Sequence, residues 1–258
     1  MENLAPNNKR IVKNTLLLYV RMLFLMVVSL YTSRVVLNAL GIEDFGIYNV
    51  VGGMVAMFSM LSGSLSAAIT RFITYELGRG DREKLRTIFS SAVTIQLGLA
   101  AIIIILAEVL GIWFLNSKMT IPLDRLAAAN WVFQFSVLTF AINLVSVPYN
   151  ASIIAHERMS AFAYISIFEA VGKLAIAYLI TISPIDRLVF YAILMCAVAL
   201  IVRFTYGIYC KRHFEECMYH FIFDKNLLKD MFGFAGWNFI GASSSVLRCL
   251  LYTSDAAD

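Results

Sequence analysis

The sequence has 258 residues, of which 60% are hydrophobic and only 15% are charged. A soluble domain usually has about half apolar and about a quarter charged residues, so this composition excludes an ordinary soluble protein. Apolar segments recur from Ile11 to Leu251, and the polar segments between them are too short for a soluble domain. We therefore predict an all-α fold, a polytopic membrane helical bundle whose functional groups lie within or beside the membrane.

The apolar segments are long enough to cross a membrane. We predict transmembrane helices at residues 12–38, 45–74, 87–115, 126–154, 161–183 and 187–210, with a seventh opening near Met231. Only the short polar turn 41–46 separates the first two, so they form a helical hairpin. Several segments exceed the roughly 20 residues that a perpendicular helix needs, which predicts tilt or extension beyond the hydrocarbon.

These helices predict a domain organisation. Residues 1–210 form a six-helix lobe, 211–230 a cytoplasmic linker and 231–248 the start of a second lobe. The last ten residues, 249–258 (C-L-L-Y-T-S-D-A-A-D), resemble the translation of a transposon-type sequencing adapter. We expect the natural part of this sequence to end at Arg248. The natural protein would then continue with a further portion, such as an equal second half. The alternative is a genuine short polar tail.

Lysine and arginine are distributed unevenly between the two sets of helix flanks. One set holds twelve of them: Lys9, Arg10, Lys13, Arg79, Arg82, Lys84, Arg86, Arg158, Lys211, Arg212, Lys225 and Lys229. The other set holds three, namely Lys118, Arg125 and Arg187. Because basic flanks face the cytoplasm, we predict a cytoplasmic N-terminus and an external turn at 41–45.

Four charged residues lie well inside predicted spans: Arg21, Glu169, Lys173 and Arg203. Arg21 lies about nine residues into its span. At a helical rise of about 1.5 Å per residue, this position is near the middle of the membrane. Glu169 and Lys173 form an i,i+4 pair in the favourable order. Since an unpaired buried cation is costly, three cations against one carboxylate predict an anionic ligand such as phosphate or pyrophosphate.

We assign these four residues as the candidate site. Arg21, Lys173 and Arg203 would bind substrate, and Glu169 would be a counter-ion or an ion-coupling group. The alternative is a structural ion pair, Glu169 with Lys173 or with Arg203, that fixes the helices and binds nothing. Three other charged residues, Arg34, Arg71 and Glu108, lie near the interfaces, where their side chains reach the headgroups. A protonatable role for Glu108 is the alternative.

Small residues and a proline predict two local features. One face of the second span consists of small residues, namely Gly52, Ala56, Ser59, Gly63 and Ala67. Such a face favours close packing against another helix. The alternative is a face that slides or opens during a conformational cycle. Pro148 predicts a kink or break in the fourth span.

The chain shows no pattern typical of a metal centre or a catalytic site. Cys210, His213, Cys217 and His220 have a zinc-like spacing, but on a continuous helix they extend over ~15 Å, too far to share one ion. No G-x-S-x-G, Walker or G-x-G-x-x-G pattern occurs. We expect no cofactor, no metal, no catalytic residue and no enzymatic activity.

Two segments carry a family resemblance. Residues 33–51 (S-R-V-V-L-N-A-L-G-I-E-D-F-G-I-Y-N-V-V) and 67–81 (A-A-I-T-R-F-I-T-Y-E-L-G-R-G-D) resemble the N-terminal hairpin of bacterial polysaccharide biosynthesis membrane proteins. These are the Wzx-type flippases of the multidrug/oligosaccharidyl-lipid/polysaccharide exporter superfamily. Of the charged residues in the spans, only Arg34 and Arg71 lie in these two segments.

The resemblance implies a function. Such proteins have two six-helix lobes around a central cavity and move an undecaprenyl-pyrophosphate-linked oligosaccharide across the bacterial inner membrane, for O-antigen, lipopolysaccharide, capsule or exopolysaccharide. Transport uses alternating access coupled to protons or sodium. The expected partners are therefore the lipid-linked oligosaccharide, membrane lipids and a coupling ion, and no nucleic acid. The chain departs from this pattern in lacking the second lobe.

Three other functions stay open. A multidrug or metabolite cation exporter of the same superfamily would prefer acidic residues in its cavity, whereas the charges here are mostly basic. An envelope polysaccharide polymerase or ligase usually carries a long outer loop, and the outer loops here are short. The third is a membrane scaffold.

Overall fold

A computed structural model describes residues 4–56, 59–117, 119, 121–122, 124–183, 186–219, 227, 229–231, 233–238, 240–241 and 244. Within these residues every regular element is a helix. Five helical segments are long and apolar enough to cross a membrane: Asn14–Val55, Arg82–Ser117, Leu126–Ala155, Met159–Ile182 and Arg187–His213. The predicted all-α membrane bundle is confirmed.

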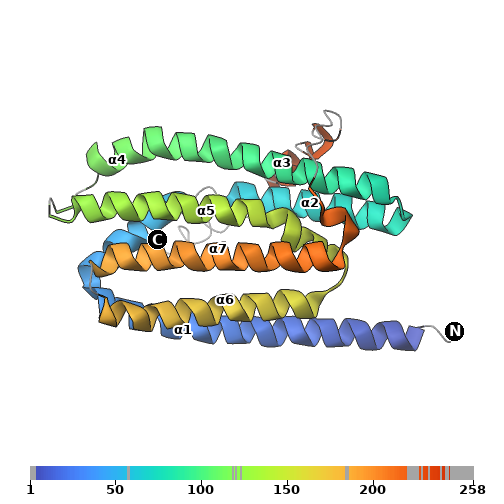
Figure 1. Ribbon diagram of the computed structural model, residues 1–258, viewed down its shortest axis with the longest axis horizontal. Coiled ribbons are helices and arrows are strands. Elements are labelled where there is room, and N and C mark those ends of the chain that lie inside the picture. Colours follow the sequence, from blue (N-terminus) through green and yellow to red (C-terminus); the bar gives the residue numbers. More distant parts are fainter. Residues whose placement is uncertain are drawn as a thin grey trace, which may run out of the picture.

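The predicted N-terminal hairpin is present, but its turn is shorter than expected. Helix α1 (Leu4–Ala56) has non-helical angles at Gly41, with φ 82° and ψ 170°. These angles are essentially restricted to glycine. Helix α2 (Ser59–Arg79) then follows, and Figure 1 shows that it lies back along the bundle toward the end where the N-terminus lies. The turn was expected over residues 41–46, but only Gly41 leaves the helical conformation. Residues 42–46 are already helical, so this part of the expectation was wrong.

The remaining helices follow the predicted spans closely. Helix α3 (Arg82–Leu106) passes through a π-helical turn, Ala107–Gly111, into α4 (Ile112–Ser117). They are followed by α5 (Leu126–Ala155), α6 (Met159–Leu179) with a 3-10 turn at Ile180–Ile182, α7 (Arg187–His213), and a second 3-10 turn at Glu215–Cys217.

Local sequence explains several helix starts and one surprise. Asp81 caps α3 by accepting from the Lys84 amide, and Asp186 caps α7 by accepting from the Leu188 and Val189 amides. Pro148 lies inside α5, which continues to Ala155, so of the expected kink or break, the break does not occur. The described residues between 229 and 241 are helical, whereas residues 249–258 lie outside the described part of the chain.

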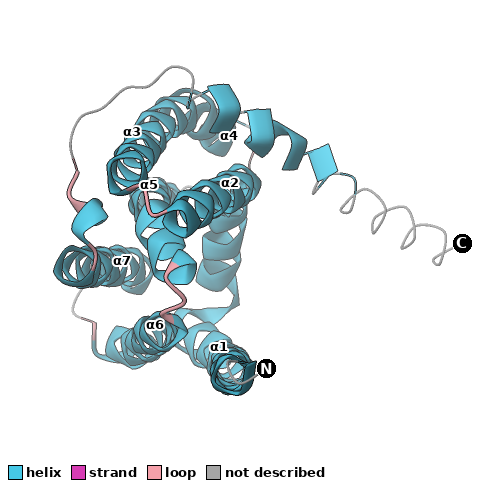
Figure 2. Ribbon diagram, turned by 90° about the vertical axis from the view of Figure 1, so that its right-hand side faces the viewer, coloured by secondary structure: helices cyan, strands magenta, loops and turns pink. Residues whose placement is uncertain are grey.

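The helices lie roughly along one another, as Figure 1 shows from the side and Figure 2 from one end. Helix α5 packs against α7, α2 and α3, and α1 packs against α6. The α2–α3 and α5–α6 connections and the end of α7 lie at the same end as the N-terminus; the Gly41 turn and the α4–α5 and α6–α7 connections lie at the other. The end with the N-terminus carries the helix flanks that are rich in lysine and arginine, and the other end carries the flanks that are poor in them. The structure therefore groups the flanks as the distribution of basic residues predicted.

Side chains fill the spaces between these helices in several buried clusters. One joins α2, α3 and α5 through Ile69, Ile88 and Ala151, and another joins α1, α6 and α7 through Val36, Ile176 and Tyr191. The outward face of α1 is apolar and exposed, with Val20 56% and Leu30 69% accessible. Such a face suits contact with lipid chains.

The small-residue face of the second span does not pack closely on another described helix. Ser59, Gly63 and Ala67 are exposed. A Cβ added at Gly52 or Gly63 would meet no described atom within 4 Å. The face predicted for close packing is therefore open.

Candidate functional site

A cavity of about 460 Å³ lies inside the bundle between both arms of α1, α6 and α7. Three of its lining residues are charged: Arg21 on α1, and Glu169 and Lys173 on α6. The wall also has small uncharged polar side chains, namely Ser29, Thr32, Ser33, Asn49 and Ser166, and the rest of it is aromatic or aliphatic. The structure thus brings together three of the four residues predicted as a site.

The predicted i,i+4 pair on α6 is formed. Lys173 Nζ donates to Glu169 Oε1 at 2.6 Å, and the two side chains are 41% and 34% exposed. One helical turn separates the residues on one face of α6, which is why both reach the same cavity. The pair neutralises itself, so Arg21 supplies the net positive charge of the cavity.

Arg21 lies against an aromatic ring. Its guanidinium carbon is 4.3 Å from the centre of the Phe162 ring, and this ring belongs to the first turn of α6. The Arg21 guanidinium therefore lies at the level of the first turn of α6, and its depth in the membrane stays a prediction. Arg21 Nε and the Thr32 hydroxyl are buried without a hydrogen-bond partner among the described residues. The two residues are too far apart to share one small anion, because eleven positions on α1 span about 16 Å at ~1.5 Å per residue. An anion that accepts from Arg21 Nε would satisfy that donor.

The structure separates Arg203 from this group. Its guanidinium lies 3.9 Å from the centre of the Tyr149 ring on α5, and it does not line the cavity that contains Arg21. The reason is helical phase. Met195 lines the cavity, and Arg203, eight residues later, is rotated from it by about 80° at 100° per residue. Of the four residues predicted as one site, Arg203 is therefore the one that the lining of this cavity does not include.

The other predicted charges also lie elsewhere. Arg34 is exposed on α1, and the Arg71 guanidinium lies 4.4 Å from the centre of the Phe234 ring. Glu108 falls in the π-helical turn and accepts from Gln134 Nε2 at 3.1 Å. None of the three lines the cavity of Arg21.

An ionic cluster that the sequence did not reveal lies at the end of the bundle near Gly41. Arg125 donates to Asp44 at 2.9 Å and to Asp186 at 2.5 Å. The Arg187 guanidinium donates to the Ala39 carbonyl at 3.1 Å. The cluster joins α1, α5 and α7 where each begins or turns. Asp186 before an apolar helix is a recognisable N-cap, but its partners come from distant parts of the chain.

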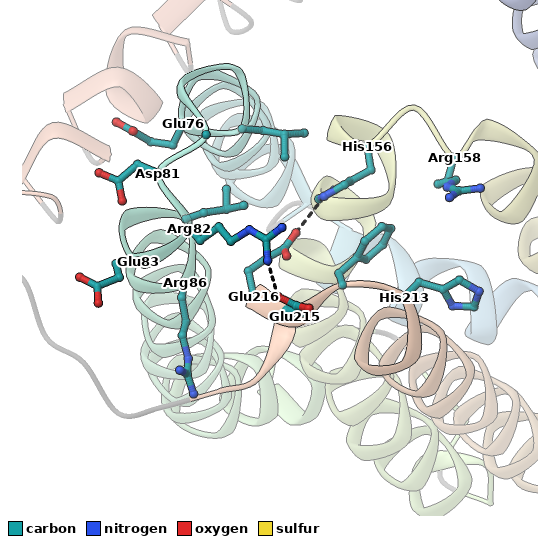
Figure 3. Close-up of a pocket in the computed structure, with 14 residues that line it drawn as sticks. Glu76, Asp81, Arg82, Glu83, Arg86, His156, Arg158, His213, Glu215 and Glu216 are labelled. Carbon is teal, nitrogen blue, oxygen red and sulfur yellow. Dashed lines mark hydrogen bonds and ion pairs between the residues drawn. The ribbon is translucent and has the colours of Figure 1, made fainter.

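The opposite end of the bundle carries a second cavity, of about 580 Å³ (Figure 3). His156 Nε2 lies 2.9 Å from Glu216 Oε1, and Arg82 donates to Glu215 at 2.7 Å. The His156 ring stacks on Phe214, with ring centres 4.1 Å apart. These contacts hold the turn after α7 against the ends of α5 and α3.

The charges of this pair depend on each other. Burial by itself would lower the pKa of His156, but bonds to Glu216 and to the Ser152 carbonyl raise it above its ordinary value. Burial would raise the pKa of Glu216, but the bond to His156 lowers it. The structure therefore favours a protonated histidine facing an ionised carboxylate.

The zinc-like spacing requires one correction. We predicted distant ligands because the helix would be continuous, but α7 ends at His213 and Cys217 lies in the following 3-10 turn. Within the described residues no group of three or more His, Cys, Asp or Glu is placed to hold a metal ion. His220 lies outside the described residues.

Comparison with known proteins adds the family. The profile of the family described as "Polysaccharide biosynthesis protein" matches residues 11–253. The chain is 22% identical over 124 residues to the "Uncharacterized membrane protein EpsK" of Bacillus subtilis (strain 168), which covers 48% of this chain and 24% of that protein. The match thus spans about a quarter of the length of this curated relative. No solved structure gives a significant match. Because the profile covers nearly the whole chain, this multi-pass membrane protein belongs to the polysaccharide biosynthesis protein family.

Proposed function

We propose that this chain forms part of a flippase that moves an undecaprenyl-pyrophosphate-linked oligosaccharide across the bacterial inner membrane, for O-antigen, capsule or exopolysaccharide export. One observation carries the proposal: Arg21 and Lys173 face a cavity of about 460 Å³ inside a membrane bundle. The family supports a role in polysaccharide export.

The charge of the cavity favours an anionic ligand. Arg21 and Lys173 stand against the single carboxylate of Glu169 among its lining residues. An uncompensated cation within a membrane costs at least about 2.5 kcal/mol, and a bound pyrophosphate would offset this cost. The same surplus disfavours the cationic substrates of a drug exporter. It also makes Arg21 more than a member of a structural ion pair, since Glu169 is bonded to Lys173.

The Glu169–Lys173 pair would contribute to the transport cycle. When pyrophosphate oxygens bind Lys173, the 2.6 Å bond to Glu169 would be replaced, and Glu169 would take up a proton or sodium ion. This exchange would link substrate binding to a coupling ion. The protein is in this proposal a transporter and not an enzyme, with the basic flanks and the N-terminus in the cytoplasm.

Export by cells carrying Arg21→Ala or Lys173→Ala, introduced into the complete gene, tests the proposal. Each variant should abolish surface polysaccharide at normal protein level in the membrane, while lipid-linked precursor accumulates. Arg34→Ala is the matched control, because Arg34 is an exposed arginine on the same arm of α1 and lies outside the cavity lining. Undiminished export in both variants would refute the assignment of the cavity.

A further inference from the structure

A smaller cavity, of about 270 Å³, lies between the second arm of α1, the start of α2, α5 and α7. Tyr48 and Met195 line both this cavity and the one that contains Arg21. Tyr48 also packs edge-on against Tyr191, with ring centres 4.7 Å apart. The two cavities therefore share part of their lining at these side chains and are neighbours.

The lining of the smaller cavity differs in chemistry from that of the larger one. None of its described lining residues is charged. Its polar side-chain groups are the Asn143 amide and four hydroxyls, those of Tyr48, Ser59, Ser136 and Thr139. The Thr139 hydroxyl donates to the Phe135 carbonyl at 2.7 Å, so its oxygen remains an acceptor. The Asn143 amide offers donors and an acceptor.

Aromatic rings form much of the rest of this wall. Phe135 and Phe140 line the cavity together with Tyr48, and Trp131 stacks on Phe135 at 6.1 Å. A mostly apolar wall with a few neutral donors and acceptors matches a sugar ring, which has apolar C–H faces and a rim of hydroxyls. A carboxylate would lose its hydration here and find no cation among the described lining residues.

We propose that this cavity binds an uncharged sugar unit, the one next to the pyrophosphate, and selects against an acidic sugar at that position. The inference rests on the proposed function, because it requires the pyrophosphate beside Arg21 and Lys173. Asn143 and Thr139 would then bond sugar hydroxyls, and the aromatic side chains would contact the ring. The larger cavity would bind the charged pyrophosphate, and the smaller cavity would bind the first sugar.

Binding measurements on the purified chain in nanodiscs test this division. The probes are decaprenyl pyrophosphate, the same lipid carrying N-acetylglucosamine, and the same lipid carrying glucuronic acid. The neutral glycolipid should bind about tenfold more tightly than the sugar-free lipid, as expected for one or two additional hydrogen bonds. The glucuronic acid lipid should bind no more tightly than the sugar-free lipid.

Variants separate the subsite from the proposed function. Asn143→Ala should weaken binding of the neutral glycolipid five- to tenfold and leave the sugar-free lipid unchanged, which also shows that the variant is folded. Arg21→Ala should weaken all three lipids. Asn130→Ala is the matched control, because Asn130 is on α5 but bonds Asn116 and the Leu126 carbonyl instead, and it should change nothing.

The outcomes distinguish the two proposals. Equal affinity of Asn143→Ala and the unaltered chain for the neutral glycolipid would overturn the sugar subsite while the flippase proposal stands. Equal binding of acidic and neutral glycolipids would overturn it as well. No binding of any probe, or no effect of Arg21→Ala, would overturn the pyrophosphate site and the sugar subsite with it.

Discussion

Replacing His156 with glutamine removes one partner of the ion pair that fastens the turn after α7 to the end of α5. The His156 Nε2 and Glu216 Oε1 atoms lie 2.9 Å apart, and the side chains are only 19% and 12% exposed. Solvent therefore screens this pair less than an ordinary surface pair. A hydrogen bond to a charged group of this kind contributes about 1.5–3 kcal/mol.

The pH dependence follows from the direction of the two shifts. The raised pKa of His156 means that its contribution is complete below its unfolded value of 6.5 and is lost as pH rises through the folded pKa. The lowered pKa of Glu216 means that its contribution is complete above its unfolded value, about 4.5, and is lost as pH falls through the folded pKa. The pair should therefore be strongest between about pH 4.5 and 6.5 and weaken toward pH 8.5.

Hydrogen exchange of the backbone amides in residues 214–219 measures this contribution locally. After correction for the intrinsic pH dependence of exchange, protection should be about 10- to 100-fold greater at pH 5.5 than at pH 8.5. His156→Gln should remove that difference. His213→Gln is the matched control, because His213 is exposed and lies beside the Tyr209 carbonyl. If His156→Gln keeps the pH dependence of the unaltered protein, the pair does not hold the turn.

Two further substitutions test the turns and ends of the bundle by thermal unfolding in detergent. Gly41→Ala should destabilise the folded protein by about 1–3 kcal/mol, because alanine disfavours φ 82°, ψ 170°. Gly46→Ala is the control, because Gly46 is helical, and it should be neutral or slightly stabilising. Equal effects of the two substitutions would refute the backbone argument. Arg125→Met should cost about 3–5 kcal/mol, since it leaves Asp44, with a side chain 7% exposed, buried without its cation. Adding Asp44→Asn should recover much of this loss, and no recovery would show that the pair is not its cause.

Much of the fold could be predicted because apolar run lengths and basic flanks are local properties of the chain. The spans at 126–154 and 187–210 agree with α5 (Leu126–Ala155) and α7 (Arg187–His213) at their starts and differ by up to three residues at their ends. The i,i+4 bond between Glu169 and Lys173 was also predictable, because one helix fixes their geometry. Of the two alternatives at Pro148, a kink or a break, the break was wrong, since packing of α5 among α2, α3 and α7 keeps the helix whole despite one lost backbone bond.

The sequence alone determined that the protein is a helical membrane bundle, that its first two spans form a hairpin, and that Arg21, Glu169 and Lys173 lie within spans. Only the tertiary structure decided which of these charges share a cavity, because that depends on the rotation of each helix about its axis. It therefore separated Arg203 from Lys173, and it joined Arg125 to Asp44 and His156 to Glu216. Contacts between residues far apart in the chain arise from packing, and no local pattern specifies them.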